Sequence, residues 1–410
     1  MRDYKMYTLK NGIRVIHNHI TTTKIVHCGI MLDIGSRDET LENQGIAHFW
    51  EHMAFKGTSK RKSFHILNRL ESIGGDLNAF TDKEKIMFFA SLRNVYFERA
   101  LELLVDITFN SIFPPEQIER EQKVILEEMS MYDDDPEDSL QDEFDAVLFK
   151  GHSLGMNILG TKKTVSSFKK KDFRKFLNEH LDTTHIVFSC VGNVPYEEVV
   201  ALTEKYFGSI PKMISKKKRI LFKGYKPSEA IIKRDIKQAR CAIGRPAFKF
   251  TDPKRSPFYI LTNILGGPGM NSRLNMALRE KHGLVYSIAA QFVSFTDTGL
   301  FVVSFGTEPT QLERSISLVK HEFKKLREEP LGKKQLSEAK EQILGHLAIS
   351  EENNVSFMMM MARNILDAGK VTTLDEIFER IKNTTVDTLK ELSNEMLDDD
   401  KFSYLRMIPK

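Results

Sequence analysis

The pentapeptide at residues 48–52 constrains the fold of this chain more than any other feature. It reads His-Phe-Trp-Glu-His, so two histidines stand four positions apart with a glutamate beside the second. A helix turns by about 100° per residue, and His48, Glu51 and His52 would therefore lie on one helix face. Two imidazoles suit Zn²⁺, and a neighbouring carboxylate suits the activation of a bound water. Two histidines do not complete a zinc site, so the fold must bring a further metal ligand to this helix.

Residues 114–136 contain the best candidate for that ligand. A catalytic zinc site takes three protein ligands and keeps a fourth position open. Prolines at both ends of this segment suit a helix start and a helix stop, and Glu121, Val124, Ile125 and Glu128 have the spacing of a buried helix face. Buried carboxylates are costly unless they are paired or bind a metal. We therefore expect Glu128 to be the third ligand and Glu121 to orient a ligand. The alternative is that both are ordinary surface charges.

Two segments of the chain resemble the pitrilysin or insulinase type of zinc peptidase, in the branch of the mitochondrial processing peptidase and its bacterial relatives. They read HFWEHMAFKGT around His48 and EREQKVILEEM around Glu128. In that family the inverted motif H-x-x-E-H is followed roughly 75 residues later by a glutamate, and Glu128 comes 76 residues after His52. The resemblance implies one Zn²⁺ per chain, bound by His48, His52 and Glu128. It also implies that Glu51 is the general base and that Glu121 is functionally important.

The resemblance extends to residues that would contact a substrate. In the family an arginine and a tyrosine seven residues apart contact the peptide, and Arg279 and Tyr286 match them. Arginine offers a fork of donors and tyrosine a hydroxyl, although without the family these two would count as surface and strand residues. Asn78 and Ala79 match a strand edge to which a substrate peptide adds as an extra strand. Some relatives divide the zinc motif and the Arg/Tyr pair between two chains. This chain holds both, which favours a homodimer that forms an enclosed chamber.

The length of 410 residues suits two domains. Both halves show strands, then helices, then a terminal strand, and this order predicts an α+β protein of two similar tandem α/β sandwich domains. Their sheets are expected to be rich in antiparallel pairs and flanked by helices, as in the pitrilysin-type fold. We expect a zinc-binding catalytic domain at 1–212, a linker at 213–227 and a C-terminal pseudo-repeat at 228–410. The methionine run 358–361 is expected to fill a core.

Composition excludes several other classes of protein. The net charge is only +4, and the basic clusters at 169–171 and 216–219 are short and lack interleaved aromatic residues, which argues against nucleic acid. Three scattered cysteines without a C-x-x-C pair indicate reduced thiols. The sequence shows no signal peptide and no apolar run long enough for a membrane span, so we expect a cytoplasmic protein without a membrane partner.

The leading interpretation is a zinc-dependent endopeptidase or oligopeptidase that acts on flexible peptides or unfolded segments. The alternative is a non-catalytic structural or peptide-binding homologue that serves as partner of an active subunit. Non-catalytic members of the family have typically lost the metal residues. This chain keeps all five, which are His48, Glu51, His52, Glu121 and Glu128, and this counts against the alternative. A serine hydrolase is a third possibility, because residues 151–155 read GHSLG. They follow a helix-like stretch, however, whereas a nucleophile elbow follows a strand.

Overall fold

The computed structural model describes residues 3–410, and the chain divides into two compact units. Unit 1 comprises the chain up to Ser130 together with Met156–Ile220 and Ser350–Val371. Unit 2 comprises Met131–Gly155, Leu221–Ile349 and Thr372–Lys410. Each unit is a mixed β-sheet with helices packed on both of its faces.

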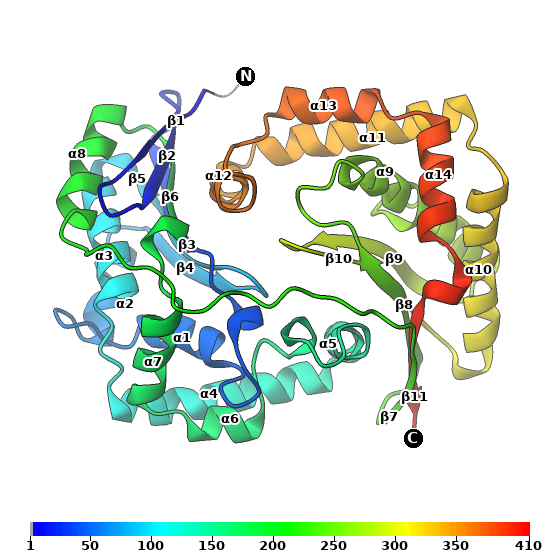
Figure 1. Ribbon diagram of the computed structural model, residues 1–410, viewed down its shortest axis with the longest axis horizontal. Helices are drawn as coiled ribbons and strands as arrows, with labels where there is room; N and C mark the ends of the chain where they lie inside the picture. The colour runs from blue at the N-terminus through cyan, green and yellow to red at the C-terminus, as the bar shows by residue number, and fades with distance from the viewer. Residues whose placement is uncertain (1–2) are drawn as a thin grey trace. The chain divides into compact units, whose positions relative to one another are not determined.

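Six strands form the sheet of unit 1, in the order β1-β2-β6-β3-β5-β4 (Figure 1). They are β1 Lys5–Thr8, β2 Arg14–His19, β3 Ile25–Leu32, β4 Asp76–Thr81, β5 Ile86–Arg93 and β6 Ile186–Gly192. β2 and β6 are parallel, and all other neighbours in this sheet are antiparallel. β4 stands at one edge of the sheet, where β5 is its neighbour.

Five strands form the sheet of unit 2, in the order β7-β11-β8-β10-β9. They are β7 Glu229–Arg234, β8 Ala239–Ala247, β9 Val285–Ser294, β10 Gly299–Thr307 and β11 Ser403–Pro409. β7 and β11 are the parallel pair here. If β1 is left aside, the two sheets have the same strand order and the parallel pair at the same place. This confirms the expectation of two tandem α/β domains.

The helices surround these sheets. Unit 1 contains α1 Ile46–Ala54, α2 Ser63–Glu71, α3 Phe97–Phe109, α4 Pro115–Asp134, α6 Lys162–Ser167, α7 Lys170–His180, α8 Tyr196–Phe207 and α12 Asn354–Ala368, with the last turn of α4 assigned to unit 2. Unit 2 contains α5 Pro136–Leu148, α9 Arg255–Gly266, α10 Leu312–Glu328, α11 Lys333–Glu351, α13 Leu374–Lys382 and α14 Val386–Met396, with the end of α11 assigned to unit 1. Within residues 3–410, no helix combines the length and the apolar character that crossing a membrane requires.

Each sheet is covered on one face by a helix from the other half of the sequence. α12 packs on the sheet of unit 1, where Met358 and Met361 are fully buried against Ile16 and Met31, and the expectation that the methionine run fills a core is confirmed there. α5 packs on the sheet of unit 2. The expected domain 1–212 includes α5, and the expected domain 228–410 includes α12. In the compact units, the segment with α5, Met131–Gly155, belongs to unit 2, and the segment with α12, Ser350–Val371, belongs to unit 1.

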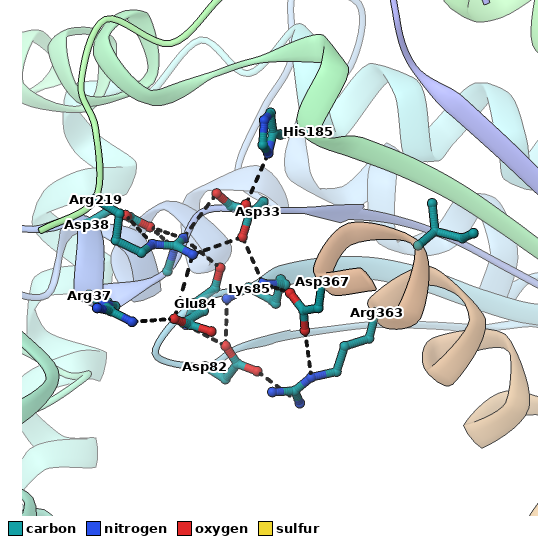
Figure 2. A network of polar contacts seen from close by, with 12 residues as sticks. Asp33, Arg37, Asp38, Asp82, Glu84, Lys85, His185, Arg219, Arg363 and Asp367 are labelled. Carbon is teal, nitrogen blue, oxygen red and sulfur yellow. Dashed lines mark hydrogen bonds and ion pairs between the residues drawn. The ribbon is translucent and has the colours of Figure 1, made fainter. Parts of the chain in front are cut away.

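A network of charged side chains links segments of unit 1 that are far apart in the sequence (Figure 2). The Nζ atom of Lys85 lies 2.8 Å from Oδ1 of Asp33 and 2.8 Å from Oδ1 of Asp367, which belongs to α12. Arg219 pairs with Asp38 at 2.8 Å. Arg219 lies in the segment expected to be a linker, so the beginning of that segment is anchored to unit 1.

Candidate metal centre

The start of helix α1 is held by the buried carboxyl group of Glu39. The two side-chain oxygens of Glu39 accept hydrogen bonds from the backbone N–H groups of Gly45, at 2.7 Å, and Ala47, at 2.8 Å. Gly45 has a φ of 92°, in the left-handed region, and a Cβ atom there would lie 2.5 Å from the carbonyl oxygen of Leu159. A carboxyl group at this helix end satisfies donors that the helix itself leaves unpaired.

The two histidines of α1 face the same side of the helix. Their ring centroids are 4.6 Å apart, while Phe49, Trp50 and Met53 are buried in the core of unit 1. Burial, reinforced by the neighbouring His52, lowers the pKa of His48 to about 3. The imidazole of His48 is therefore neutral near pH 7 and has a lone pair to offer to a metal.

Helix α4 supplies the carboxylates. Its buried face consists of Ile118, Glu121, Ile125 and Met129. The sequence-based stripe is wrong at Val124, which is 45% exposed. The helical repeat of about 3.6 residues, continued from Ile118, places the centre of the buried face near Ile125 and Met129, with Glu121 at its side, and turns Val124 outward.

His48, His52 and Glu128 converge on one point, and we call them the candidate zinc centre. The Nε2 atom of His48 lies 3.7 Å from Oε1 of Glu128, and the Nε2 atom of His52 lies 3.6 Å from its Oε2. One donor atom from each residue can be chosen so that all lie within 4.8 Å of one another. Two donors that each lie about 2.1 Å from one zinc ion are about 3.4–3.6 Å apart. The two separations between the histidines and Glu128 are close to that value and too long for good hydrogen bonds, so the residues fit the ion.

Glu51 is held in place by a residue of the neighbouring strand. Its Oε2 accepts a hydrogen bond of 2.6 Å from the hydroxyl of Thr81, the last residue of β4. Burial raises the pKa of Glu51, although the Thr81 hydrogen bond and the proximity of His52 oppose the shift. The structure thus places a carboxylate of increased basicity on the same helix as the two imidazoles.

Glu121 connects the Nδ1 side of His52, the side away from Glu128, to a lysine. Its Oε2 lies 3.1 Å from Nδ1 of His52, and its Oε1 lies 2.8 Å from Nζ of Lys56. Burial would raise the pKa of Glu121, but the hydrogen bonds from His52 and Lys56 outweigh it and lower the pKa. Sequence reasoning missed Lys56, Thr81 and Glu39. Lys56 stands within the segment HFWEHMAFKGT, but no local pattern pairs Lys56 or Thr81 with these carboxylates.

The predicted substrate residues of unit 1 lie on the edge strand. Asn78 and Ala79 belong to β4, with Asn78 exposed and Ala79 half-buried. β4 ends at Thr81, so the strand leads directly to the partner of Glu51. This placement suits the addition of a peptide strand, and that role stays a prediction.

The other predicted substrate residues, Arg279 and Tyr286, lie together in unit 2. Arg279 is part of a π-helical segment, Asn275–Glu280, a rare conformation that is frequent at functional sites. Its guanidinium carbon lies 5.8 Å from the ring centroid of Tyr286, whose side chain is 84% exposed. Contact with a substrate stays a prediction for both.

The serine of the GHSLG segment lacks the setting of a nucleophile elbow. Ser153 begins a short 3₁₀ turn, Ser153–Gly155, that follows helix α5. A nucleophile elbow stands between a strand and a helix. The serine-hydrolase alternative therefore has no structural support.

Two protein families match adjacent parts of the chain. Residues 14–162 match the insulinase family, peptidase family M16, and residues 167–343 match the peptidase M16 inactive domain. The chain is also 32% identical over 396 residues to the "uncharacterized zinc protease YmxG" of Bacillus subtilis (strain 168), covering 97% of this chain and 96% of that protein. This chain belongs to the M16 insulinase family. The candidate zinc centre of the M16 chain, with Glu51 and Glu121, lies in the first matched segment, and Arg279 and Tyr286 lie in the second.

A further relative agrees with this assignment, and two solved structures share the fold. An "uncharacterized zinc protease" of Rickettsia felis is 32% identical to the M16 chain over 394 residues, covering 96% of this chain and 95% of that protein. The crystal structure of a peptidase M16 inactive domain from Pseudomonas fluorescens superimposes with a TM-score of 0.92 at 19% identity, covering 100% of this chain and 98% of that one. A protease from Helicobacter pylori gives a TM-score of 0.91 at 21% identity, with both chains covered completely. The two structures show that the M16 chain shares their fold.

Proposed function

We propose that this chain is a zinc-dependent endopeptidase or oligopeptidase that hydrolyses peptide bonds in flexible peptides or unfolded segments. The observation that carries the proposal is the convergence of His48, His52 and Glu128, with Glu51 on the same helix. The relatives from Bacillus subtilis and Rickettsia felis are named zinc proteases, which supports the choice of metal. A zinc ion bound there would polarise the scissile carbonyl and lower the pKa of a bound water to about 7.

Glu51 serves as the general base in this proposal. Thr81 holds Oε2 of Glu51, so Oε1 is the atom that accepts the proton of the attacking water. The same oxygen later gives the proton to the leaving amine. Because the hydrogen bond fixes the carboxylate, little reorganisation is needed at the moment of proton transfer.

Glu121 selects the tautomer of His52. When the Nδ1–H group of His52 donates to Oε2 of Glu121, the Nε2 atom keeps its lone pair on the side of Glu128. A carboxylate in this position orients the ring of a ligand histidine and raises its basicity.

The substrate binds mainly through its backbone. A peptide that adds to the free edge of β4, beside Asn78 and Ala79, forms main-chain hydrogen bonds that depend little on its sequence. Arg279 and Tyr286 donate hydrogen bonds to the peptide near the scissile bond. We therefore expect cuts at many different residues, and mass spectrometry of a digested mixed peptide library measures this breadth.

We also propose that the protein works as a homodimer, because one chain holds both the zinc motif and the Arg279/Tyr286 pair. Multi-angle light scattering measures the mass directly. A mass of one chain at all concentrations would contradict the dimer.

Metal analysis and cleavage of a quenched fluorescent peptide test the function. Glu51→Gln should retain zinc and lose at least 100-fold in kcat/KM, since general-base catalysis contributes about 10²–10⁴-fold. Glu128→Gln should lose zinc. The matched control is Glu127→Gln, an exposed neighbour on α4, which should change neither quantity.

Two results would overturn the proposal. If Glu51→Gln binds zinc and cleaves as fast as the wild type, Glu51 is not the base. If the zinc-loaded wild type cleaves no member of a peptide library, the alternative of a non-catalytic structural or peptide-binding homologue replaces the proposal.

A further inference from the structure

A chain of three side chains leads from Lys56 to the candidate zinc centre. The Nζ atom of Lys56 lies 2.8 Å from Oε1 of Glu121, and Oε2 of Glu121 lies 3.1 Å from Nδ1 of His52. The Nε2 atom of the same ring faces Glu128. The two oxygens of Glu121 are thus divided between one ammonium group and one imidazole.

The loop after α1 fixes the position from which Lys56 reaches. The backbone N–H of Lys56 donates to the carbonyl of Met53 at 3.1 Å. The next residue, Gly57, has a φ of +149°, and the hydroxyl of Thr58 donates to Asp106 at 2.8 Å. Because the chain is held on both sides of Lys56, the ammonium group is directed to Glu121 with little loss of conformational freedom.

The two histidines of the candidate zinc centre differ in the hydrogen bonding of their Nδ1 atoms. Nδ1 of His52 has Glu121 as its partner, whereas Nδ1 of His48 is buried and has no hydrogen-bond partner within residues 3–410. The orientation of the metal-binding imidazoles by hydrogen bonds therefore depends on Glu121. A change that turns this carboxylate away from His52 leaves neither ring with a partner at Nδ1.

Charge balance gives Lys56 a second effect. Zinc is bound by neutral imidazoles, so the ionised carboxylates of Glu51, Glu121 and Glu128 would leave one formal negative charge beyond the two positive charges of the ion. The ammonium group of Lys56 supplies the missing positive charge. An unbalanced charge in a half-buried region is costly, so both the bound ion and the set of carboxylates are more stable with the lysine in place.

We propose that Lys56 is a positioning residue of the zinc centre, which holds Glu121 against His52 and so directs the Nε2 lone pair of His52 to the ion. This inference rests on the proposed function, since it concerns the same centre. Lys56 touches neither the ion nor the substrate in this proposal, and it acts through Glu121.

Zinc affinity of the metal-free protein, measured by competition with a chromophoric chelator, tests the proposal without peptide cleavage. Lys56→Met, which keeps the length of the stem, should weaken zinc binding about tenfold, the lower end of the effect of removing a residue that supports a ligand. Lys56→Arg should lie closer to the wild type than to Lys56→Met. The matched control Lys60→Met removes an exposed charge from the same loop and should leave the affinity unchanged. The visible absorption bands of the cobalt(II)-substituted protein should shift in Lys56→Met and not in the control.

A double-mutant cycle separates positioning from a general structural effect. In a Glu121→Gln background, Lys56→Met should weaken zinc binding no further, because the residue through which it acts is already changed. An equal loss in both backgrounds, or a Lys56→Met variant with wild-type affinity and wild-type cobalt spectrum, overturns the role of Lys56 and leaves the proposed function intact. A wild-type protein that binds no zinc overturns both.

Discussion

Replacement of Lys85 by methionine tests the charged network of unit 1. The side chain of Lys85 is 1% exposed, and its ammonium lies between Asp33 and Asp367, at 2.8 Å from each. Methionine keeps most of the stem volume and removes the charge. The variant therefore leaves two carboxylates, one on the loop after β3 and one on α12, without the cation between them (Figure 2).

The two carboxylates respond differently. Burial would raise the pKa of Asp33, but the hydrogen bond from His185 and the charges of Lys85 and Arg219 outweigh it and hold the pKa well below its usual range. Asp33 thus keeps two partners in the variant. Burial already raises the pKa of Asp367 although Lys85 opposes the shift, so this carboxylate is the one that takes up a proton when Lys85 is lost.

The free energy needed to protonate Asp367 limits how much stability Lys85→Met can lose. Protonation of an aspartate with a reference pKa of about 3.9 costs about 5 kcal/mol at pH 7.5 and about 1.5 kcal/mol at pH 5, at about 1.36 kcal/mol per unit. Removal of one partner from a buried ion pair costs about 3–5 kcal/mol. We therefore expect Lys85→Met to lower the free energy of unfolding by about 3–5 kcal/mol at pH 7.5, and by only about 1.5 kcal/mol at pH 5, where protonation is easier.

Tryptophan fluorescence during urea denaturation measures this quantity. The chain has one tryptophan, Trp50, which is fully buried on α1, so its fluorescence follows the unfolding of unit 1. Lys334→Met is the control, because Lys334 is 88% exposed and its pairing with Glu338 at 3.8 Å should be worth less than about 1 kcal/mol. A loss below about 1 kcal/mol in Lys85→Met that is the same at both pH values would refute the reasoning.

Three further predictions concern the helix start and the substrate residues. Burial raises the pKa of Glu39 to about 8, so its contribution to stability is complete below about pH 4.3 and is lost as the pH rises through 8. Glu39→Gln should flatten the pH dependence of the unfolding free energy between about pH 4.3 and pH 8, measured by Trp50 fluorescence during urea denaturation. Gly45→Ala should cost more than about 2 kcal/mol, because it adds a backbone clash to left-handed strain, whereas Gly74→Ala, with open space around it, should cost about 1 kcal/mol. Tyr286→Phe should leave the melting temperature unchanged, since the side chain is 84% exposed, and should lower kcat/KM of peptide cleavage.

The sequence predicted those parts of the centre that follow from spacing along one helix. His48, Glu51 and His52 share a face because a helix repeats every 3.6 residues, and the structure has the helix where the motif requires it. Glu128 needed more, since the spacing between two distant segments comes from the family resemblance and not from helix geometry. The prediction that Val124 lies on the buried face was wrong for a physical reason. A stripe that includes charged residues has no clear centre, so the face it predicts can be turned by one position.

The fold was predicted in its order of elements and less well in the packing of its helices. Alternation of strands and helices indicated two similar units, and the common strand order of the two sheets agrees. The helices α5 and α12 are amphipathic whichever sheet they cover, and no local pattern states that each packs on the sheet of the other half. Only the tertiary fold contains that information.

The packing of α12 on the sheet of unit 1 helps to fix the strand that holds Glu51. Thr81, which holds Glu51, is followed by Asp82, whose side chain closes the turn between β4 and β5 by accepting from the backbone of Glu84 and Lys85. α12 contacts this turn through Arg363, 3.8 Å from Asp82, and through Asp367, which pairs with Lys85 (Figure 2). The end of β4 is thereby fixed by residues about 280 positions later in the chain. The second half of the sequence thus supports Glu51, the proposed general base, through α12, independently of the substrate contacts proposed for Arg279 and Tyr286.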